Sequence, residues 1–312
     1  MRQQLDNILT EIRKVVVGKE DVTRRILRTI LADGHILLDD LPGVGKTTLA
    51  VALSRAVGLS CRRIQFTPDV MPSDIVGFSV YDREQGGFSY RPGVVNDTNL
   101  LLGDEINRTS SKTQSALLET MEERQVTVDG QTYPLPAPFI VIATQNNVGA
   151  AGTQLLPYAQ MDRFMVRLSI GQPGHDALMT LLRDRQSGDP LDRVQVAASR
   201  EELLRMQAAV RSVTSCDAIL DYIARLTLAS GEHPMVEVGI SPRGALFLDR
   251  AARAEAWMAG RDYVTGEDVQ AVFADVCAHR LILTRRALAG GANASQVLSG
   301  LLRTVTVPDR KR

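Results

Sequence analysis

The chain has 312 residues, of which 44% are hydrophobic, so it can form one large α/β domain and a smaller second domain. Acidic and basic residues number 36 each, and this balance argues against a strongly basic surface for nucleic acid. No apolar run approaches the roughly 20 residues that cross a bilayer, and the first residues lack a signal-peptide core, so we expect a cytoplasmic protein without a membrane span.

Residues 1–34 are predicted to be helical because apolar side chains recur there at helical spacing. Within this region, residues 15–19 form a short apolar run broken by glycine. By itself such a run is a packed linker. Beside a phosphate-binding loop, it can place Val17 and the backbone of Gly18 against an adenine ring.

The stretch 35–53 carries the clearest signal in the chain. Residues 35–38 are predicted to be a buried strand, and a glycine-rich turn and a helix follow it. Strand, glycine-rich loop and helix in this order are typical of a phosphate-binding loop, or P-loop. Gly43 and Gly45 allow backbone N–H groups to face phosphate oxygens, and the helix N-terminus adds partial positive charge.

Two side chains of this loop have specific roles in such a site. Lys46 can reach the β- and γ-phosphates of a nucleotide, and the Thr47 hydroxyl can ligate Mg²⁺. The loop is expected to be completed by Pro42, Val44 and Thr48. The sequence departs from the usual pattern at Asp40, where the first glycine is expected. An ordinary glycine turn is the alternative, but the Gly-Lys-Thr-Thr sequence argues against it.

A second apolar strand, expected over residues 99–103, ends in two carboxylates. Asp104 is expected to hold the Mg²⁺ shell, and Glu105 to polarise the attacking water as general base. Arg108 follows closely, and it can contribute charge to the site or to a subunit boundary. Helix packing or a surface ion pair is an equal alternative for Arg108.

Further strands, two hairpins and a helix are expected around these motifs. Residues 62–66 are predicted to form a short strand, 78–94 a protruding hairpin, and 125–133 a second hairpin turning at an Asp-Gly pair. For 78–94 the alternative is a surface loop without function. Ser111 is predicted to cap a helix that ends near Arg124.

A third apolar strand, residues 139–145, is followed by Asn146. The amide of Asn146 can orient water or contact the γ-phosphate, although asparagine is also a common turn residue. Three strands now end in a phosphate loop, two acids and an amide. Because open parallel sheets bind ligands at the carboxyl ends of their strands, we expect these groups to form one site.

Two more arginines are candidates for contacts with phosphate. Arg163 precedes a strand predicted over 164–170, and from the edge of a nucleotide domain it can reach a neighbouring subunit's site. A local ion pair between Asp162 and Arg163 is the alternative. Ser241 and Pro242 suit the start of a helix, so Arg243 projects from its first turn, where it can meet a phosphate.

The composition changes at residues 171–174, so we predict a nucleotide-binding α/β domain over 1–171 and a helical domain over 172–312. Helices are predicted from residue 199, 217, 242 and 265, and we expect His279 and Arg280 to be on the surface. Residues 284–300 show no chemistry. The three cysteines match no metal pattern and are expected to be buried free thiols: Cys61, Cys216 and Cys277.

Together these blocks resemble the AAA+ ATPases, and within them the MoxR family, over nearly the whole chain. The resemblance is carried by residues 42–48, 101–108, 114–130, 143–146, 162–164 and 241–243. It implies a P-loop AAA+ core with a five-stranded parallel sheet, β-hairpin insertions at about 78–94 and 125–133, and a C-terminal all-α lid. It also implies sensor 1 at Asn146, an arginine finger at Arg163 and sensor 2 at Arg243. The sequence departs from the family pattern at Asp40 and at Asn147, where the family often has proline.

Family members resemble one another in forming ATP-dependent rings, commonly hexamers, that remodel partner proteins, often together with a separate protein that carries a von Willebrand factor A-type domain. We therefore expect a Mg²⁺-dependent ATPase that binds ATP and works as a ring. The alternative is an AAA+ nucleic-acid motor or clamp-loader-like ATPase, which the zero net charge and the hairpin at 127–133, without Lys or Arg, make less attractive. A nucleotide-gated assembly switch is a third option, and the acid pair argues against it.

Overall fold

The computed structural model describes residues 2–40, 43–84, 86–145, 156–184, 186 and 188–308. Its centre is a parallel sheet of five strands in the order β2-β5-β8-β1-β9. The strand bounds are Cys61–Gln65, Leu100–Asp104, Ile140–Gln145, Ile36–Asp39 and Val166–Leu168, in that order. The prediction of a five-stranded parallel sheet is confirmed.

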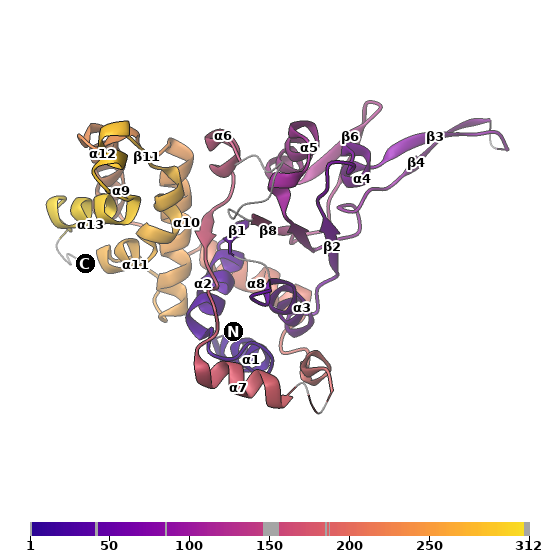
Figure 1. Cartoon of the computed structure of the whole chain (residues 1–312), viewed down its shortest axis with the longest axis horizontal. Coiled ribbons are helices and arrows are strands. Elements are labelled where there is room, and N and C mark those ends of the chain that lie inside the picture. The colour runs from indigo at the N-terminus through magenta and orange to yellow at the C-terminus, as the bar shows by residue number, and fades with distance from the viewer. Residues whose placement is uncertain are drawn as a thin grey trace.

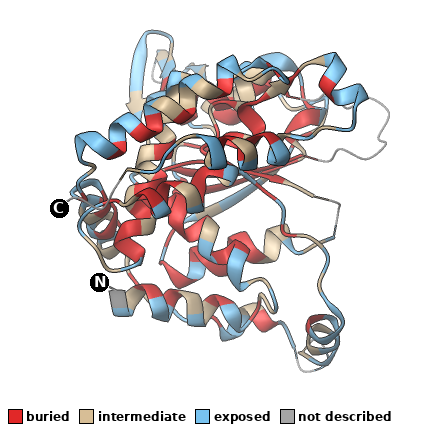
Figure 2. Cartoon of the chain, turned by 90° about the vertical axis from the view of Figure 1, so that its left-hand side faces the viewer, coloured by how far each residue is buried: buried red, intermediate tan, exposed pale blue. Residues whose placement is uncertain are grey.

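The sheet separates two apolar cores because side chains alternate between its faces. On β5 and β8, Leu102 and Ile142 belong to one cluster, while Leu101 and Val141 belong to the other. The first cluster also holds the apolar faces of α1 (Arg2–Arg13), α2 (Glu20–Leu31), α3 (Lys46–Ala56) and α8 (Arg200–Arg211). The second holds those of α4 (Pro72–Val76) and α5 (Ser111–Glu123). Figures 1 and 2 show the resulting layers, with buried residues concentrated between helices and sheet.

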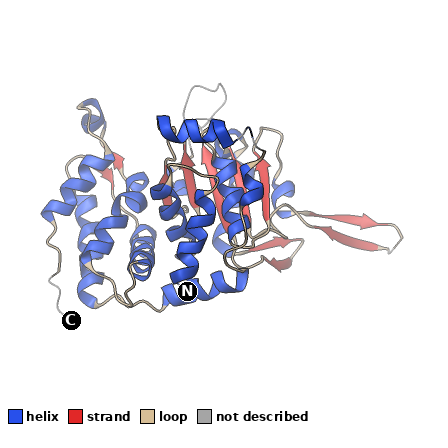
Figure 3. Cartoon of the chain, turned by 90° about the horizontal axis from the view of Figure 1, so that it is seen from below, coloured by secondary structure: helices blue, strands red, loops and turns tan. Residues whose placement is uncertain are grey.

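Two antiparallel hairpins leave this core, as predicted. Strands β3 (Phe78–Asp82) and β4 (Gly87–Arg91) form a long arm that extends away from the body of the molecule (Figures 1 and 3). Strands β6 (Gln125–Val128) and β7 (Gln131–Pro134) turn at residues 129–130, both with positive φ. The rings of Tyr90 and Tyr133 stack 4.1 Å apart, so the two hairpins support each other.

The C-terminal part is mainly helical and packs beside the sheet (Figure 1). Its larger helices are α9 (Asp217–Glu232), α10 (Pro242–Met258), α11 (Gly266–Cys277) and α13 (Ala294–Thr304), and α12 (Arg285–Ala289) is short. A small antiparallel pair, β10 (Val236–Val238) with β11 (Ile282–Leu283), was not predicted. The helices α6 (Tyr158–Met161) and α7 (His175–Asp184) precede and follow β9 along the chain. Short 3-10 turns occur at Ile106–Arg108, Pro190–Arg193 and Ala278–Arg280. The domain boundary at 171/172 falls between β9 and α7 and stays a prediction.

Most helix caps follow the sequence. Ser199 forms a capping box with Glu202, and the Ser241 hydroxyl accepts a hydrogen bond from the N–H of Gly244. The cap of α5 is one residue earlier than predicted, because the Ser110 hydroxyl accepts from Thr113 and Ser111 is already helical. Within the part of the chain that the structure describes, no helix combines the length and apolarity needed to cross a bilayer.

The predicted burial of four residues needs correction. The prediction that His279 and Arg280 lie on the surface is wrong, because both are buried. Helix α11 ends at Cys277, and the following 3-10 turn directs the two side chains inward. Cys216 is exposed and Cys61 only half-buried, so Cys277 is the cysteine that matches the expected buried thiol.

The buried Arg280 also holds the chain immediately before β9. Its guanidinium donates to the backbone carbonyls of Asp162, Phe164, Met165 and Val276, and its Nε lies 2.8 Å from the Asp162 carboxylate. Regular pairing of β9 with β1 begins at residue 166 and ends at Leu168, so the strand is shorter than predicted at both ends.

We expect the Arg280→Met variant to lose about 3–5 kcal/mol of unfolding free energy, because it leaves a buried carboxylate and several buried carbonyls without their cation. Urea denaturation measures this loss. Arg286→Met removes an exposed arginine and should stay within about 0.5 kcal/mol of wild type. Asp162→Asn, which keeps an acceptor, should lose less than Arg280→Met. A loss below about 1 kcal/mol for Arg280→Met would contradict the importance of this contact.

The buried His35 makes stability depend on pH. Burial lowers the pKa of His35 well below its ordinary value of 6.5. Its Nδ1 accepts from the Val141 N–H (3.0 Å) and its Nε2 lies 3.1 Å from the Met121 carbonyl, an arrangement that suits the neutral ring. Above pH 6.5 the ring is neutral in the folded and the unfolded chain. Below it, the unfolded chain takes up a proton that the folded chain resists, so the unfolding free energy falls.

Between pH 6.5 and 5.5 this loss should be about 1 kcal/mol for His35. His35→Gln can keep both hydrogen bonds, and it should abolish this contribution of about 1 kcal/mol from His35 to the decrease in unfolding free energy, measured by urea denaturation at the two pH values. His175→Gln, which changes an exposed imidazole, is the matched control and should leave it unaltered. An equal pH dependence in wild type and His35→Gln would refute the assignment.

Candidate nucleotide-binding site

The loop between β1 and α3 has the backbone that its glycines predict. Gly43 and Gly45 have φ values of 83° and 92°, in the left-handed region that side chains disfavour, and α3 begins immediately afterwards at Lys46. The Lys46 Nζ donates to the backbone carbonyl of Asp40 at 2.9 Å, which folds the side chain back over the loop. Pro42 lies outside the described residues.

The two acids stand at the carboxyl end of β5, next to β8. The Asp104 carboxylate is buried and accepts hydrogen bonds from Arg63 Nε (2.6 Å) and from the Thr144 hydroxyl (3.3 Å). Glu105 has a φ of 58°, its N–H donates to the Thr144 hydroxyl (2.9 Å), and its carboxylate pairs with Arg108 at 2.7 Å. One hydroxyl of β8 therefore orients both acids.

These groups surround a cavity of about 320 Å³. It is lined by Gly43, Gly45, Lys46, Thr47, Thr48, Arg63, Gln65, Asp104, Glu105 and Thr144. Parallel register explains the convergence, because Asp39 pairs with Gln145 and Gln65 pairs with Asp104, so all these strands end at one edge. The structure thus brings Lys46, Thr47, Asp104 and Glu105 together as predicted.

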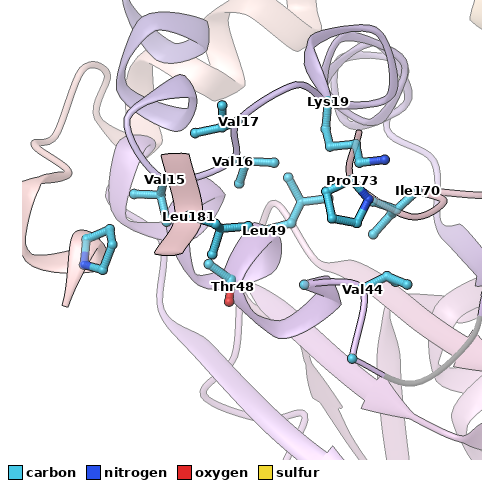
Figure 4. Close-up of a pocket in the computed structure, with 13 residues that line it drawn as sticks. Val15, Val16, Val17, Lys19, Val44, Thr48, Leu49, Ile170, Pro173 and Leu181 are labelled. Carbon is cyan, nitrogen blue, oxygen red and sulfur yellow. The ribbon is translucent and has the colours of Figure 1, made fainter. Parts of the chain in front are cut away.

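A second, more apolar cavity of about 190 Å³ adjoins the first (Figure 4). The two share Gly43, Gly45 and Thr48 as lining residues. Its apolar walls are Val15, Val16, Val17, Val44, Leu49, Ile170, Pro173, Leu181 and Pro190. Gly18 is not among the described residues that line this cavity, and its Cα lies against Ala177 of α7, where a Cβ would be 3.0 Å away. Val17 and Val44 line this cavity, and their contact with an adenine ring stays a prediction.

The other two candidate arginines lie apart from this site. Arg163 and Arg243 line a third cavity of about 470 Å³, which shares none of its described lining residues with the other two. Both pair with Glu122 at the end of α5, Arg163 at 3.2 Å. The alternative of an ion pair between Asp162 and Arg163 is not what the structure has, since Asp162 pairs with Arg280. Asn146 and Asn147 lie outside the described residues.

Known proteins share both parts of this fold. The family described as "ATPase family associated with various cellular activities (AAA)" matches residues 35–166, and the AAA lid domain matches residues 228–300. The chain is 42% identical to the uncharacterized protein YeaC of Bacillus subtilis over 97% of this chain and 95% of that protein. It is 38% identical to chaperone MoxR1 of Mycobacterium tuberculosis, over 97% of this chain and 82% of that protein. The chain belongs to the MoxR family of AAA+ ATPases.

Solved structures agree with this membership. The crystal structure of "a putative ATPase" from Cytophaga hutchinsonii matches with a TM-score of 0.91 and 37% identity, over 99% of this chain and 96% of that one. Nucleotide binding and ATP hydrolysis are the activities that the AAA family implies for this MoxR-type chain.

The site also fits a metal of one kind. Among the described residues, no group of three or more His, Cys, Asp or Glu side chains could enclose a metal ion. Mg²⁺ needs no such cage, because it keeps several waters and takes one or two carboxylates together with substrate phosphates. The Asp104 carboxylate and the Thr47 hydroxyl line one cavity and offer suitable oxygen ligands.

Sequence reasoning missed Arg63, Thr144 and Glu122. Thr144 lies in the block 143–146, in which the sequence suggests a role only for Asn146. Arg63 could have been found by assuming that the short strand at 62–66 pairs with the strand that ends in Asp104. Because successive side chains of a strand point to opposite faces of the sheet, one of the two adjacent arginines then points toward the site. Glu122 had no local signal, because its partners lie far along the chain.

Proposed function

We propose that this MoxR-family chain is a Mg²⁺-dependent ATP hydrolase that works as a ring and remodels partner proteins. The observation that carries the proposal is the cavity in which Lys46, Thr47, Asp104 and Glu105 meet beside the P-loop. A phosphate-binding loop, a metal-binding carboxylate and a general base are the parts that hydrolysis of ATP to ADP and phosphate requires.

The residues of this chain divide the work as follows. The N–H groups of residues 43–48 and the Lys46 ammonium hold the phosphates, and Lys46 exchanges its contact with the Asp40 carbonyl for a phosphate oxygen. Glu105 leaves Arg108 and accepts a proton from the water that attacks the γ-phosphorus. Asn146 orients that water. Thr47 and Asp104 would hold Mg²⁺, which would supply charge neutralisation at the phosphates.

The adenine ring is assigned to the apolar cavity. It adjoins the phosphate cavity through shared P-loop residues, and Val17 and Val44 supply two of its walls. An apolar, partly enclosed cavity with few polar groups is the ordinary environment of a nucleotide base.

Arg163 and Arg243 are assigned to a neighbouring subunit's nucleotide. Their cavity shares no described lining residue with the site of their own chain, so a role in catalysis there would need a large displacement. In a ring, a surface arginine of one subunit faces the nucleotide of the next. Glu122 holds both cations together in the single chain, and phosphate is a stronger competitor for a guanidinium pair.

Two observations support the proposed remodelling of partner proteins. MoxR1 of Mycobacterium tuberculosis is described as a chaperone. The β3–β4 arm carries exposed aromatic side chains, with Phe88 78% exposed and in contact with Tyr81. Such an arm suits contact with another protein. We expect a hexamer, and a separate partner with a von Willebrand factor A-type domain.

ATP turnover per subunit should rise with protein concentration as the ring assembles. Arg163→Ala should bind ATP yet turn it over about 10³-fold more slowly, because a trans arginine stabilises charge in the transition state. Arg286→Ala, an exposed arginine elsewhere, is the matched control. Mixing Arg163→Ala with the base variant Glu105→Gln should restore activity, since some interfaces then pair an intact base with an intact arginine. Flat specific activity and an unimpaired Arg163→Ala would refute the shared site.

Arg63 should compete with Mg²⁺ for Asp104. The Arg63 Nε lies 2.6 Å from that carboxylate, so breaking the ion pair costs electrostatic energy. The Arg63 side chain is 54% exposed, so it has room to move away into solvent. Arg63→Ala should lower the Mg²⁺ concentration for half-maximal ATPase by about two- to fivefold, the range of an exposed ion pair. Arg62→Ala, on the opposite face of the same strand, should leave the Mg²⁺ requirement unchanged. A higher Mg²⁺ requirement for Arg63→Ala would show that Arg63 assists the metal instead.

A further inference from the structure

Asp40 occupies the position at which a P-loop usually begins with glycine, and its side chain has a place in the structure. The carboxylate accepts hydrogen bonds from the Ser169 hydroxyl (2.7 Å), the Ile170 N–H (2.5 Å) and the Gly171 N–H (3.0 Å). Asp40 is not among the described residues that line either nucleotide cavity. It therefore faces the segment that follows β9.

The backbone of that segment is shaped to hold a carboxylate. Gly171 has a φ of 69°, in the left-handed region, and this turn directs two successive N–H groups at one acceptor. Consecutive N–H groups arranged in this way form an anion-binding concavity. Hydrogen bonds to an ionised acceptor are about twice as strong as neutral ones.

The same segment, residues 169–173, forms one wall of the apolar cavity. Ile170 and Pro173 both line it, as Figure 4 shows. Lys19 holds the segment from the other side, because its Nζ donates to the Gln172 carbonyl at 2.6 Å. The wall of the base cavity is thus tied to the first residue of the phosphate loop and to the linker that carries Val17.

We propose that Asp40 is a positioning residue that fixes the base-side wall of the ATP site relative to the P-loop. The inference rests on the proposed function, since it assumes that the apolar cavity takes the adenine ring. It predicts opposite effects on the two halves of the ligand. Loss of the carboxylate frees the wall and lowers the affinity for the adenine ring. Loss of a negative charge next to the loop raises the affinity for the phosphates.

The test compares two probes, ATP and inorganic tripolyphosphate, with Mg²⁺ present, by calorimetry on the full chain. Asp40→Asn keeps the size of the side chain but loses the charge and one acceptor oxygen. We expect its dissociation constant for ATP to rise about tenfold, in line with the loss of charge-assisted hydrogen bonds. The dissociation constant for tripolyphosphate should stay the same or fall.

Two further variants sharpen the result. Asp39→Asn removes the neighbouring carboxylate, which pairs with Arg167 at 3.0 Å, and should leave the ratio of the two dissociation constants unchanged. Ser169→Ala removes one donor and should weaken ATP binding less than Asp40→Asn. The combined effect with Asp40→Asn should be smaller than the sum of the two single effects, because both changes weaken the same cluster of hydrogen bonds.

The proposal is overturned if Asp40→Asn weakens ATP and tripolyphosphate equally, or if it weakens neither. Equal weakening would mean a direct role in phosphate binding or a general structural defect. If wild type binds ATP no more tightly than tripolyphosphate, or binds neither, the assignment of the cavity to ATP fails. The proposed function then fails with it.

Discussion

The buried guanidinium of Arg280 helps to join the two parts of this protein. Arg280, at the end of α11, enters the core at the start of β9, where it meets the Asp162 carboxylate and several carbonyls. Gly244 of α10 makes this possible, because a Cβ there would lie 2.6 Å from Arg280 Cδ. Asp162 also accepts from the Ser241 hydroxyl at 2.9 Å, which caps α10. The direction of α10, and with it the place of Arg243, depends on this junction.

The nucleotide site depends in turn on the parallel sheet. Strand register brings the P-loop, the acids and Thr144 to one edge without any covalent link between them. The acids are fixed at the backbone as well as at the side chain, since the Thr144 hydroxyl binds the N–H of Glu105 and the carboxylate of Asp104. The ion pair of Glu105 with Arg108 is partly exposed and can exchange with water or phosphate. The pair of Asp104 with Arg63 is exposed only on the arginine side, because the carboxylate is buried.

The sequence was informative where the cause of a structure is local. The P-loop, the acid pair at a strand end and the Asp-Gly hairpin each follow from neighbouring residues, and the structure has them in place. Arg280 and Asp162 are 118 residues apart, so the local pattern could only continue the helix through Arg280, and the prediction of a surface position was wrong. The pairing of Glu122 with two distant arginines is likewise a product of packing, which no local pattern encodes.

Strand β9 is held at both ends by side chains from elsewhere in the chain. The Arg280 guanidinium donates hydrogen bonds to the carbonyls that precede the strand, and the Asp40 carboxylate accepts hydrogen bonds from the N–H groups that follow it. The strand itself has only three residues, about 10 Å of extended chain, and is paired to β1 along its length. One short paired strand is therefore all that separates the junction with the C-terminal helices from the wall on which the base would rest.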